Sequence, residues 1–409
     1  MFERGKRGGK AFLPSAMLAA LAAVAASAAT LVALRSGTSS ARTRSDPPAA
    51  SLALGATGEE ALYSPPKWAP ASLTPPKSRL RLAHLPTPIH RWPLPKVAEE
   101  TEVWIKRDDM TGCELSGNKI RKLEFLLADA KAKGCDCVIT VGGFQSNHCR
   151  ATAAAARRVG LEPHIILRSD LEPGADPGMC GNLLVDRMVD AKIHFVSDAK
   201  FNAKGGWKLV CELREDLEEE GKTPYAFPSG GSNALGTWGY LEALREIMEQ
   251  TESAGLAFDR IYFGCGSGGT AAGLALGVHL SGMRDAGTEL VALGVDDSPD
   301  IFYDKLDGIF RSCFSDFTDV KSREILTILD CVGLGYAQAT DEELRFALET
   351  ARATGVCLDP VYTGKAALGM ARDLRARPVK RALFIHTGGL LGTYAKAEQL
   401  QALLTAERS

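Results

Sequence analysis

The sequence has no surplus of charge of either sign. Its 48 Lys and Arg residues are balanced by 50 Asp and Glu residues, so the formal net charge at pH 7 is only -2. Binding to a nucleic-acid backbone requires a basic patch or stripe. The near balance therefore argues against a nucleic-acid partner and favours a small-molecule one.

The sequence also lacks a metal-binding cysteine pattern. Of its ten cysteines only Cys135 and Cys137 lie close together, and they form C-x-C, not the repeated C-x-x-C of a zinc site. We therefore predict reduced thiols and no metal. The sequence has no internal repeat and, after residue 80, no low-complexity tract.

The first eighty residues resemble a targeting segment followed by a linker. An uncharged, alanine-rich run over residues 11–34 lies between basic residues. It is longer than the roughly 7–15 apolar residues of a secretory signal and reaches the roughly 20 needed to span a bilayer, but alanine is only weakly apolar. A cleaved leader, a membrane anchor over 11–34 and a disordered tail all stay open. The Arg/Ser/Ala-rich, acid-poor composition favours import into a plastid or mitochondrion, with a secretory or membrane-anchored protein as the alternative.

Residues 38–76 have the Ser/Pro/Ala composition of a linker, so we expect the fold to begin near Leu80. Beyond it, short apolar runs alternate with helical patterns, which predicts parallel α/β layers. The expected strands are Val103–Lys106, Cys137–Val141, His164–Leu167, Lys192–Val196, Arg260–Phe263, Glu289–Val295 and Ala382–Ile385. The expected helices are Lys119–Ala132, His148–Val159, Trp207–Glu220, Leu235–Thr251, Ala271–Ser281, Asp341–Thr354 and Gly364–Leu374.

A lysine follows a glycine-containing loop in Ser116–Glu124 (SGNKIRKLE). At a predicted helix start, Lys119 can be partly desolvated, which lowers the pKa of its amine and makes it a better Schiff-base nucleophile. Alone this signal is weak, because lysines at helix starts are usually surface residues.

Two further motifs follow predicted strands. In Gly142–His148 (GGFQSNH), Ser146, Asn147 and His148 could meet a ligand, although helix capping explains Ser146 or Asn147 equally well. Gly264–Thr270 (GCGSGGT) opens a helix whose first amides and dipole favour an anion such as phosphate.

The glycine-rich segment also permits a different interpretation. Residues 264–269 satisfy G-x-G-x-x-G, and Asp296 or Asp297 ends the next predicted strand, where a ribose-binding acid would stand. A nicotinamide-dependent dehydrogenase is therefore an alternative, although it gives Lys119 no role.

The last two motifs lie near the C-terminus. In Leu358–Ala366 (LDPVYTGKA), Tyr362 and Thr363 could stack on and hydrogen-bond to a heteroaromatic ring. Phe384–Gly389 (FIHTGG) ends a strand in a glycine turn that allows close approach of a ligand.

Together, in this order, these motifs resemble the tryptophan-synthase-β-like group of pyridoxal-phosphate enzymes, and specifically the branch with D-cysteine desulfhydrase and 1-aminocyclopropane-1-carboxylate (ACC) deaminase. The resemblance covers roughly Leu82 to Leu400. It implies a two-domain, three-layer α/β/α fold with mostly parallel sheets, and a homodimer. The large cofactor-binding domain would comprise 81–121 plus 236–400, the small α/β domain 122–235, and the targeting segment and linker 1–80.

The resemblance also implies residue roles. Lys119 would carry pyridoxal 5'-phosphate and move the Cα proton of the substrate. Asn147 would hydrogen-bond the cofactor's phenolic oxygen, and the amides of 266–270 would hold its phosphate. The implied catalytic residues are Lys119, Ser146, Tyr336 and Tyr362. The implied cofactor-binding residues are Lys119, Asn118, Asn147, Gly266, Ser267, Gly268, Gly269, Thr270 and Thr363, and the substrate-binding residues are Ser146, Asn147 and His148.

One position separates the two activities of this branch. ACC deaminase-like sequences carry glutamate immediately after the matching tyrosine, where it keeps the cofactor's pyridine nitrogen protonated. Thr363 stands there instead, and His148 replaces the deaminases' glutamine. A neutral hydroxyl suits β-elimination of hydrosulfide, so we expect D-cysteine to be converted to pyruvate, ammonia and hydrogen sulfide, with ACC deamination as the alternative.

Overall fold

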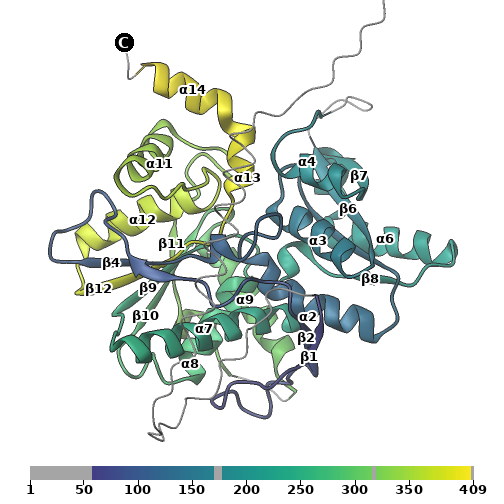
Figure 1. The fold of residues 1–409 in the computed structure, drawn as a ribbon, viewed down its shortest axis with the longest axis horizontal. Coiled ribbons are helices and arrows are strands. Elements are labelled where there is room, and N and C mark those ends of the chain that lie inside the picture. Colours follow the sequence, from purple (N-terminus) through teal and green to yellow (C-terminus); the bar gives the residue numbers. More distant parts are fainter. Residues whose placement is uncertain (1–57, 170–176, 316–318, 407–409) are drawn as a thin grey trace, which may run out of the picture. The chain divides into compact units, whose positions relative to one another are not determined.

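The computed structural model describes residues 58–169, 177–315 and 319–406, which form sheets covered by helices (Figure 1). A six-stranded sheet has the order β11-β10-β9-β12-β4-β3, and all of its neighbouring strands are parallel except the antiparallel pair β3 and β4. Its strands are β3 (Ile89–Arg91), β4 (Glu102–Lys106), β9 (Arg260–Cys265), β10 (Glu289–Gly294), β11 (Thr327–Asp330) and β12 (Arg381–Ile385).

A second, four-stranded sheet is entirely parallel, in the order β7-β6-β5-β8. Its strands are β5 (Cys137–Gly143), β6 (Glu162–Ser169), β7 (Lys192–Ser197) and β8 (Pro224–Ala226). These four strands fall within the predicted small domain, and those of the six-stranded sheet fall within the predicted large one. The predicted α/β fold with mostly parallel sheets is confirmed, whereas the division into two domains stays a prediction.

Helices follow most strands and supply the crossovers of the parallel sheets. The α-helices are α2 (Lys119–Ala132), α3 (Asn147–Arg158), α4 (Gly181–Met188), α5 (Asp198–Lys204), α6 (Gly206–Glu219), α7 (Ala234–Ala254), α8 (Gly269–Leu280), α9 (Pro299–Cys313), α10 (Ser322–Ile325), α11 (Asp341–Thr354), α12 (Thr363–Ala376), α13 (Leu390–Thr393) and α14 (Ala397–Ala406). Short 3-10 turns occupy η1 (Asp108–Met110), η2 (Ser229–Gly231) and η3 (Tyr394–Lys396). All seven expected strands and all seven expected helices are present, with ends that differ by a few residues.

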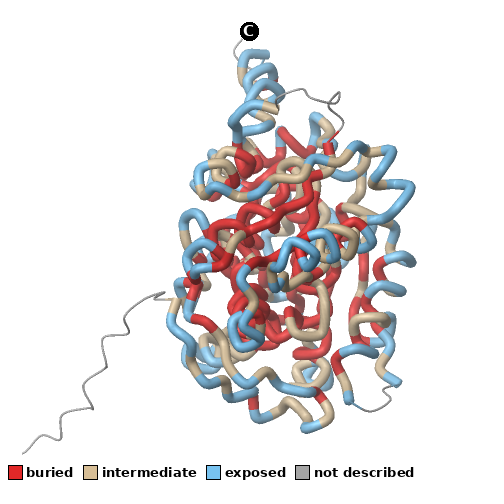
Figure 2. The backbone as a smooth tube through the Cα atoms, turned by 90° about the vertical axis from the view of Figure 1, so that its right-hand side faces the viewer, coloured by how far each residue is buried: buried red, intermediate tan, exposed pale blue. Residues whose placement is uncertain are grey.

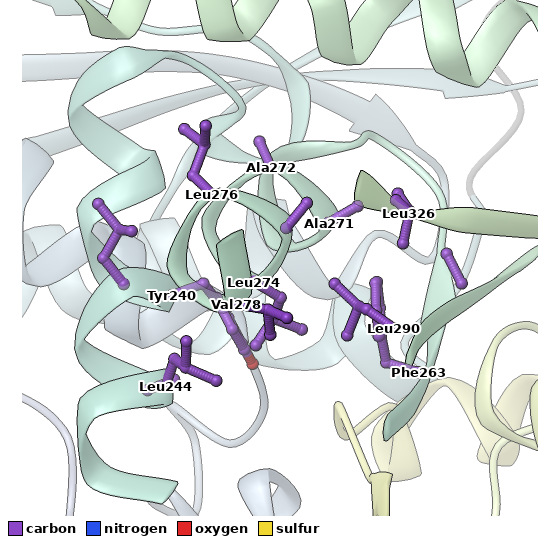
Figure 3. Close-up of a cluster of buried hydrophobic side chains, with 14 of the residues drawn as sticks. Tyr240, Leu244, Phe263, Ala271, Ala272, Leu274, Leu276, Val278, Leu290 and Leu326 are labelled. Carbon is purple, nitrogen blue, oxygen red and sulfur yellow. The ribbon is translucent and has the colours of Figure 1, made fainter. Parts of the chain in front are cut away.

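The largest apolar cluster lies where α7 and α8 pack against the six-stranded sheet. Figure 2 shows the buried segments gathered along the central strands and helices. In Figure 3 Leu274 of α8 lies between Tyr240 of α7 and the strand residues Phe263 and Leu290. Gly273 permits this close packing, because a Cβ there would lie 2.5 Å from the Cβ of Tyr240. Burial on both faces explains why these strands read as nearly continuous apolar runs.

The fold begins earlier than the sequence predicted. Residues 58–80 include the antiparallel pair β1 (Glu60–Leu62) and β2 (Ser78–Leu80), so the predicted linker is wrong over residues 58–76. The ring of Tyr63 makes edge-on contacts with two rings of the core. Its centroid lies 4.9 Å from that of Phe125 and 5.7 Å from that of Trp238. Leu73 is 1% exposed. These apolar anchors attach a segment of linker-like composition to the core.

The candidate membrane anchor over 11–34 lies outside the described residues. Among the residues that the structure does describe, no helix combines the length and apolar character of a membrane span.

Candidate active site

The predicted motifs meet at one cavity, at the carboxyl ends of β5, β9, β10 and β12. Its empty space, including the part open to solvent, is about 660 Å³. The carboxyl ends of parallel strands are where α/β folds bind ligands. The predicted residues that line it are Asn118, Lys119, Ser146, Asn147, His148, Gly266, Ser267, Gly268, Thr270, Tyr336 and Tyr362. Gly269 and Thr363 do not line it, whereas Cys265, Asp296, Thr387 and Gly388, absent from the predicted set, do.

Lys119 is the first residue of α2 and faces the cavity. The preceding Gly117 has φ +103°, and a Cβ there would lie 2.8 Å from the carbonyl oxygen of Thr387, so this position requires glycine. The Asn118 amide donates a hydrogen bond to the same oxygen at 3.0 Å. Burial lowers the pKa of Lys119 to about 8, against weaker opposing effects of Cys265 and Cys149. A larger fraction of the amine is therefore neutral and nucleophilic near pH 7 than for an exposed lysine.

The glycine-rich loop turns from β9 into α8 beside this amine. Gly268 caps α8 with φ +91°, so the helix start faces the cavity and favours an anion there. Gly269 does not line the cavity, and its amide donates to the Ser232 hydroxyl at 3.1 Å. That hydroxyl donates in turn to Ser267 Oγ at 2.8 Å, which holds the loop from behind.

Lys122 is a functional candidate that the sequence reasoning missed. It lies one helical turn after Lys119, is 1% exposed, and donates from Nζ to the Gly230 carbonyl oxygen at 3.1 Å. A Cβ added to Gly269 would lie 2.9 Å from this nitrogen, so the amine stands directly behind the glycine-rich loop. Burial, and next the charge of Lys119, hold the pKa of Lys122 well below its usual value. An anion in the loop would restore its charge. The three-residue spacing from Lys119 was the available signal.

The start of α3 presents Ser146 and Asn147. Ser146 does cap the helix, since its Oγ accepts from the Cys149 amide at 3.2 Å, and it lines the cavity as well. Asn147 Oδ1 accepts from Asn182 Nδ2 at 2.9 Å. His148 is 3% exposed, with its Nε2 2.9 Å from Thr140 Oγ1, and burial keeps its pKa well below the usual value. The imidazole is therefore neutral near pH 7.

Tyr336 and Tyr362 form a hydroxyl pair in the cavity, with their Oη atoms 2.6 Å apart. Enclosure of the hydroxyl raises the pKa of Tyr336 to about 12, although 38% of the residue remains exposed. Burial, followed by the influence of Tyr336, raises the pKa of Tyr362 well above its usual value. Both phenols are therefore protonated near pH 7 and can pass a proton along their shared hydrogen bond.

The hydroxyl of Thr363 is bonded within the fold, and Thr363 does not line the cavity. It is fully buried at the start of α12, donates from Oγ1 to Asp359 Oδ1 at 2.6 Å, and accepts from the Asp359 amide at 2.9 Å. Both hydrogen bonds of the Thr363 hydroxyl are therefore made to Asp359 within a local turn. Besides Thr270, the cavity is lined by Thr387, which follows β12. Its signal was the glycine turn after the strand.

Comparison with known proteins identifies the family of this fold and site. A family model described as "Pyridoxal-phosphate dependent enzyme" matches residues 80–388. A mitochondrial bifunctional D-cysteine desulfhydrase/1-aminocyclopropane-1-carboxylate deaminase from Arabidopsis thaliana is 50% identical over 349 residues, covering 84% of this chain and 86% of the relative. A putative 1-aminocyclopropane-1-carboxylate deaminase from Pyrococcus horikoshii is 37% identical over 334 residues, covering 80% and 96%. The crystal structure of an ACC deaminase homologue superposes with a TM-score of 0.70 at 36% identity, covering 81% and 97%.

Proposed function

Because the chain belongs to the family of pyridoxal-phosphate-dependent enzymes, we propose that it eliminates hydrosulfide from the β-carbon of D-cysteine, giving pyruvate, ammonia and hydrogen sulfide. The observation that carries the proposal is the desolvated amine of Lys119 in a cavity that also contains an anion-binding helix start. ACC deamination is the second candidate, since the name of the Arabidopsis relative includes both activities. Family membership argues against the dehydrogenase alternative.

The cavity fits pyridoxal phosphate. The start of α8 and the amine of Lys122 suit its phosphate, and Gly266 leaves room beside the ring of Tyr362, whose Cε1 would lie 3.2 Å from a Cβ on that glycine. When bound, the cofactor supplies the electron sink that lets the Cα–H bond of an amino acid break. Lys119 would hold the cofactor through its amine, and the same amine would take the Cα proton of the substrate. Ser146 and the start of α3 hold the substrate carboxylate.

The hydroxyls of the cavity support D-cysteine over ACC. Tyr336, Tyr362 and Thr387 are neutral, and hydrosulfide is a good leaving group that needs no charged partner to strengthen the electron sink. Asp296 also lines the cavity, and burial together with the neighbouring Asp297 raises its pKa, which favours its uncharged form. The preference thus rests on the neutral hydroxyls of Tyr336, Tyr362 and Thr387 rather than on Thr363.

A product assay with D-cysteine, L-cysteine and ACC in parallel tests the proposal. We expect sulfide and pyruvate in equal amounts from D-cysteine, at a higher rate than from L-cysteine, and a slower or absent release of ammonia from ACC. The rates are measured on protein saturated with pyridoxal phosphate. Ammonia release from ACC without sulfide from D-cysteine would make the second candidate the function, and no product from any of the three would overturn both.

We also propose that the segment before residue 58 directs the protein to an organelle, with the mitochondrion favoured over the plastid because the Arabidopsis relative is named mitochondrial. Residues 1–57 fused to a fluorescent reporter should accumulate in mitochondria, since their composition is basic, alanine-rich and acid-poor. The chain from residue 58 onward, fused to the same reporter, is the control and should stay diffuse. Identical distributions of the two fusions would remove the proposal. The homodimer stays a prediction.

A further inference from the structure

A buried hydrogen-bond chain behind the cavity has a defined direction. It begins at Arg150, a fully buried residue on α3, and runs through Asn182 on α4 to Asn147, which lines the cavity. Arg150 Nε donates to Asn182 Oδ1 at 3.1 Å. Asn182 Nδ2 donates to Asn147 Oδ1 at 2.9 Å and to the Gln145 carbonyl oxygen at 2.9 Å.

The chemistry of arginine sets this direction. A guanidinium has donors and no acceptor, so the amide atom of Asn182 that faces Arg150 must be its oxygen. The NH2 group of Asn182 therefore faces Asn147 and meets an oxygen there. Because Asn147 Oδ1 is held at that end, the NH2 group of Asn147 is the end left for the cavity. If the Asn147 amide were reversed, its NH2 group would face the NH2 group of Asn182, and neither could accept a hydrogen bond.

The same arginine connects this chain to the loop that precedes Lys119. Its Nη1 donates to the Glu114 carbonyl oxygen at 2.6 Å and its Nη2 to the Ser116 carbonyl oxygen at 3.0 Å. Burial lowers the pKa of Arg150 to about 10, so the guanidinium is still charged at neutral pH. Arg150 thus anchors both the loop of the attachment lysine and the amide of Asn182.

We propose that Asn182 is a positioning residue that fixes the Asn147 amide as a hydrogen-bond donor toward the cavity, with Arg150 setting the direction of the chain. The proposal deepens the proposed function, and it rests on the role that the family resemblance implies for Asn147, a hydrogen bond to the phenolic oxygen of the cofactor. The ligand atom that it serves is the phenolic oxygen of pyridoxal phosphate, which accepts a hydrogen bond when it is ionised. Asn182 acts through Asn147 and touches no ligand itself.

Asn182→Asp tests the direction of the chain with little change in volume. A carboxylate keeps the bond from Arg150 Nε and strengthens it by charge, but it cannot donate to Asn147. The Asn147 amide is then drawn to turn its NH2 group toward the carboxylate and its oxygen toward the cofactor. We expect the dissociation constant for pyridoxal phosphate to rise on the order of tenfold, equivalent to about 1.4 kcal/mol. The visible absorbance of the bound cofactor should shift as well.

A second variant separates positioning from simple packing. Asn182→Ala removes the donor without putting an acceptor in its place. The proposal therefore predicts that Asn182→Asp loses more cofactor affinity than Asn182→Ala. Packing alone predicts the opposite order, because alanine loses both the volume and the Arg150 contact. The opposite order, or unchanged affinity and absorbance in Asn182→Asp, overturns the proposal.

Two further measurements complete the experiment. In an Asn147→Ala background, Asn182→Asp should have no further effect on the dissociation constant, and a persisting effect would show that Asn182 does not act through Asn147. The matched control is Asn233→Asp, because Asn233 only accepts a bond, from the Gly236 amide at 2.8 Å, and a carboxylate serves as well. Pyridoxal phosphate alone is the probe, so the outcome does not depend on whether D-cysteine is the substrate.

Discussion

Replacing Lys119 with alanine is expected to abolish both stable attachment of pyridoxal phosphate and production of sulfide. Lys119 is the lysine that lines the cavity within the described residues, and burial already lowers the pKa of its amine to about 8. A positioned acid or base alone contributes about 10²–10⁴-fold to a rate. Since the same amine also carries the cofactor, we expect turnover to fall by more than the roughly 10²-fold at the lower end of that range. Sulfide production should then lie below detection. We expect the fold of the variant to stay stable, because the substitution removes a buried amine whose charged form is disfavoured by desolvation.

The attachment is measured by reducing the cofactor onto the protein with borohydride and locating it by peptide mass spectrometry. Wild-type protein should carry the label at Lys119, and Lys119→Ala should carry none. Lys122→Ala is the informative comparison, because its amine stands behind the glycine-rich loop and contacts the Gly230 carbonyl oxygen. This variant should keep the label at Lys119 and bind the cofactor more weakly. A label on Lys122 in the Lys119→Ala protein would contradict the assignment.

The sequence predicted the parts of the site that topology brings together. The motifs around Lys119, Asn147, Gly266 and Tyr362 each precede or begin a helix of the parallel α/β layers. In such layers the carboxyl ends of the strands share one edge of the sheet, so residues far apart in the chain converge there. Period and composition determine this placement, whereas the family resemblance implied the site residues, of which eleven line one cavity.

The direction of an individual side chain was not predictable in the same way. Thr363 stands beside Tyr362 in the sequence, yet its hydroxyl turns inward because Asp359, four residues earlier, offers a buried acceptor and a backbone donor. Gly269 belongs to the glycine motif, but its amide is taken by Ser232, which is distant in the sequence. Both outcomes depend on partners that only the folded backbone brings within hydrogen-bond distance.

Composition also misplaced the beginning of the fold. Residues 58–76 have the proline and serine content of a linker, and such composition usually indicates that too little apolar surface is available for burial. Here Tyr63 and Leu73 are sufficient, because each enters an existing hydrophobic cluster instead of having to form one. Composition averaged over a stretch of sequence does not reveal single apolar residues of this kind.

Thr387→Val and Thr363→Val are expected to have different effects, and the difference identifies which hydroxyl serves the cofactor. Valine keeps the branched shape and removes the hydroxyl. An unsatisfied partner in a buried site costs about 1–3 kcal/mol. For Thr387, which lines the cavity, that cost falls on the bound cofactor, so turnover of D-cysteine should drop about 5- to 150-fold with little change in the free energy of unfolding.

For Thr363 the same cost falls on the fold. Valine there leaves the Asp359 backbone amide without its hydrogen bond in a fully buried turn and leaves Asp359 Oδ1 with only the bond from the Thr363 backbone amide at 2.9 Å, so the free energy of unfolding should fall by about 1–3 kcal/mol. Turnover per folded molecule should change far less than in Thr387→Val. Denaturant unfolding and steady-state rates, measured on both variants with the cofactor in excess, separate the two effects. If Thr363→Val slows turnover at unchanged stability while Thr387→Val does neither, the cofactor's hydroxyl partner is Thr363. The neutral lining at Thr387 then no longer supports elimination from D-cysteine over ACC deamination.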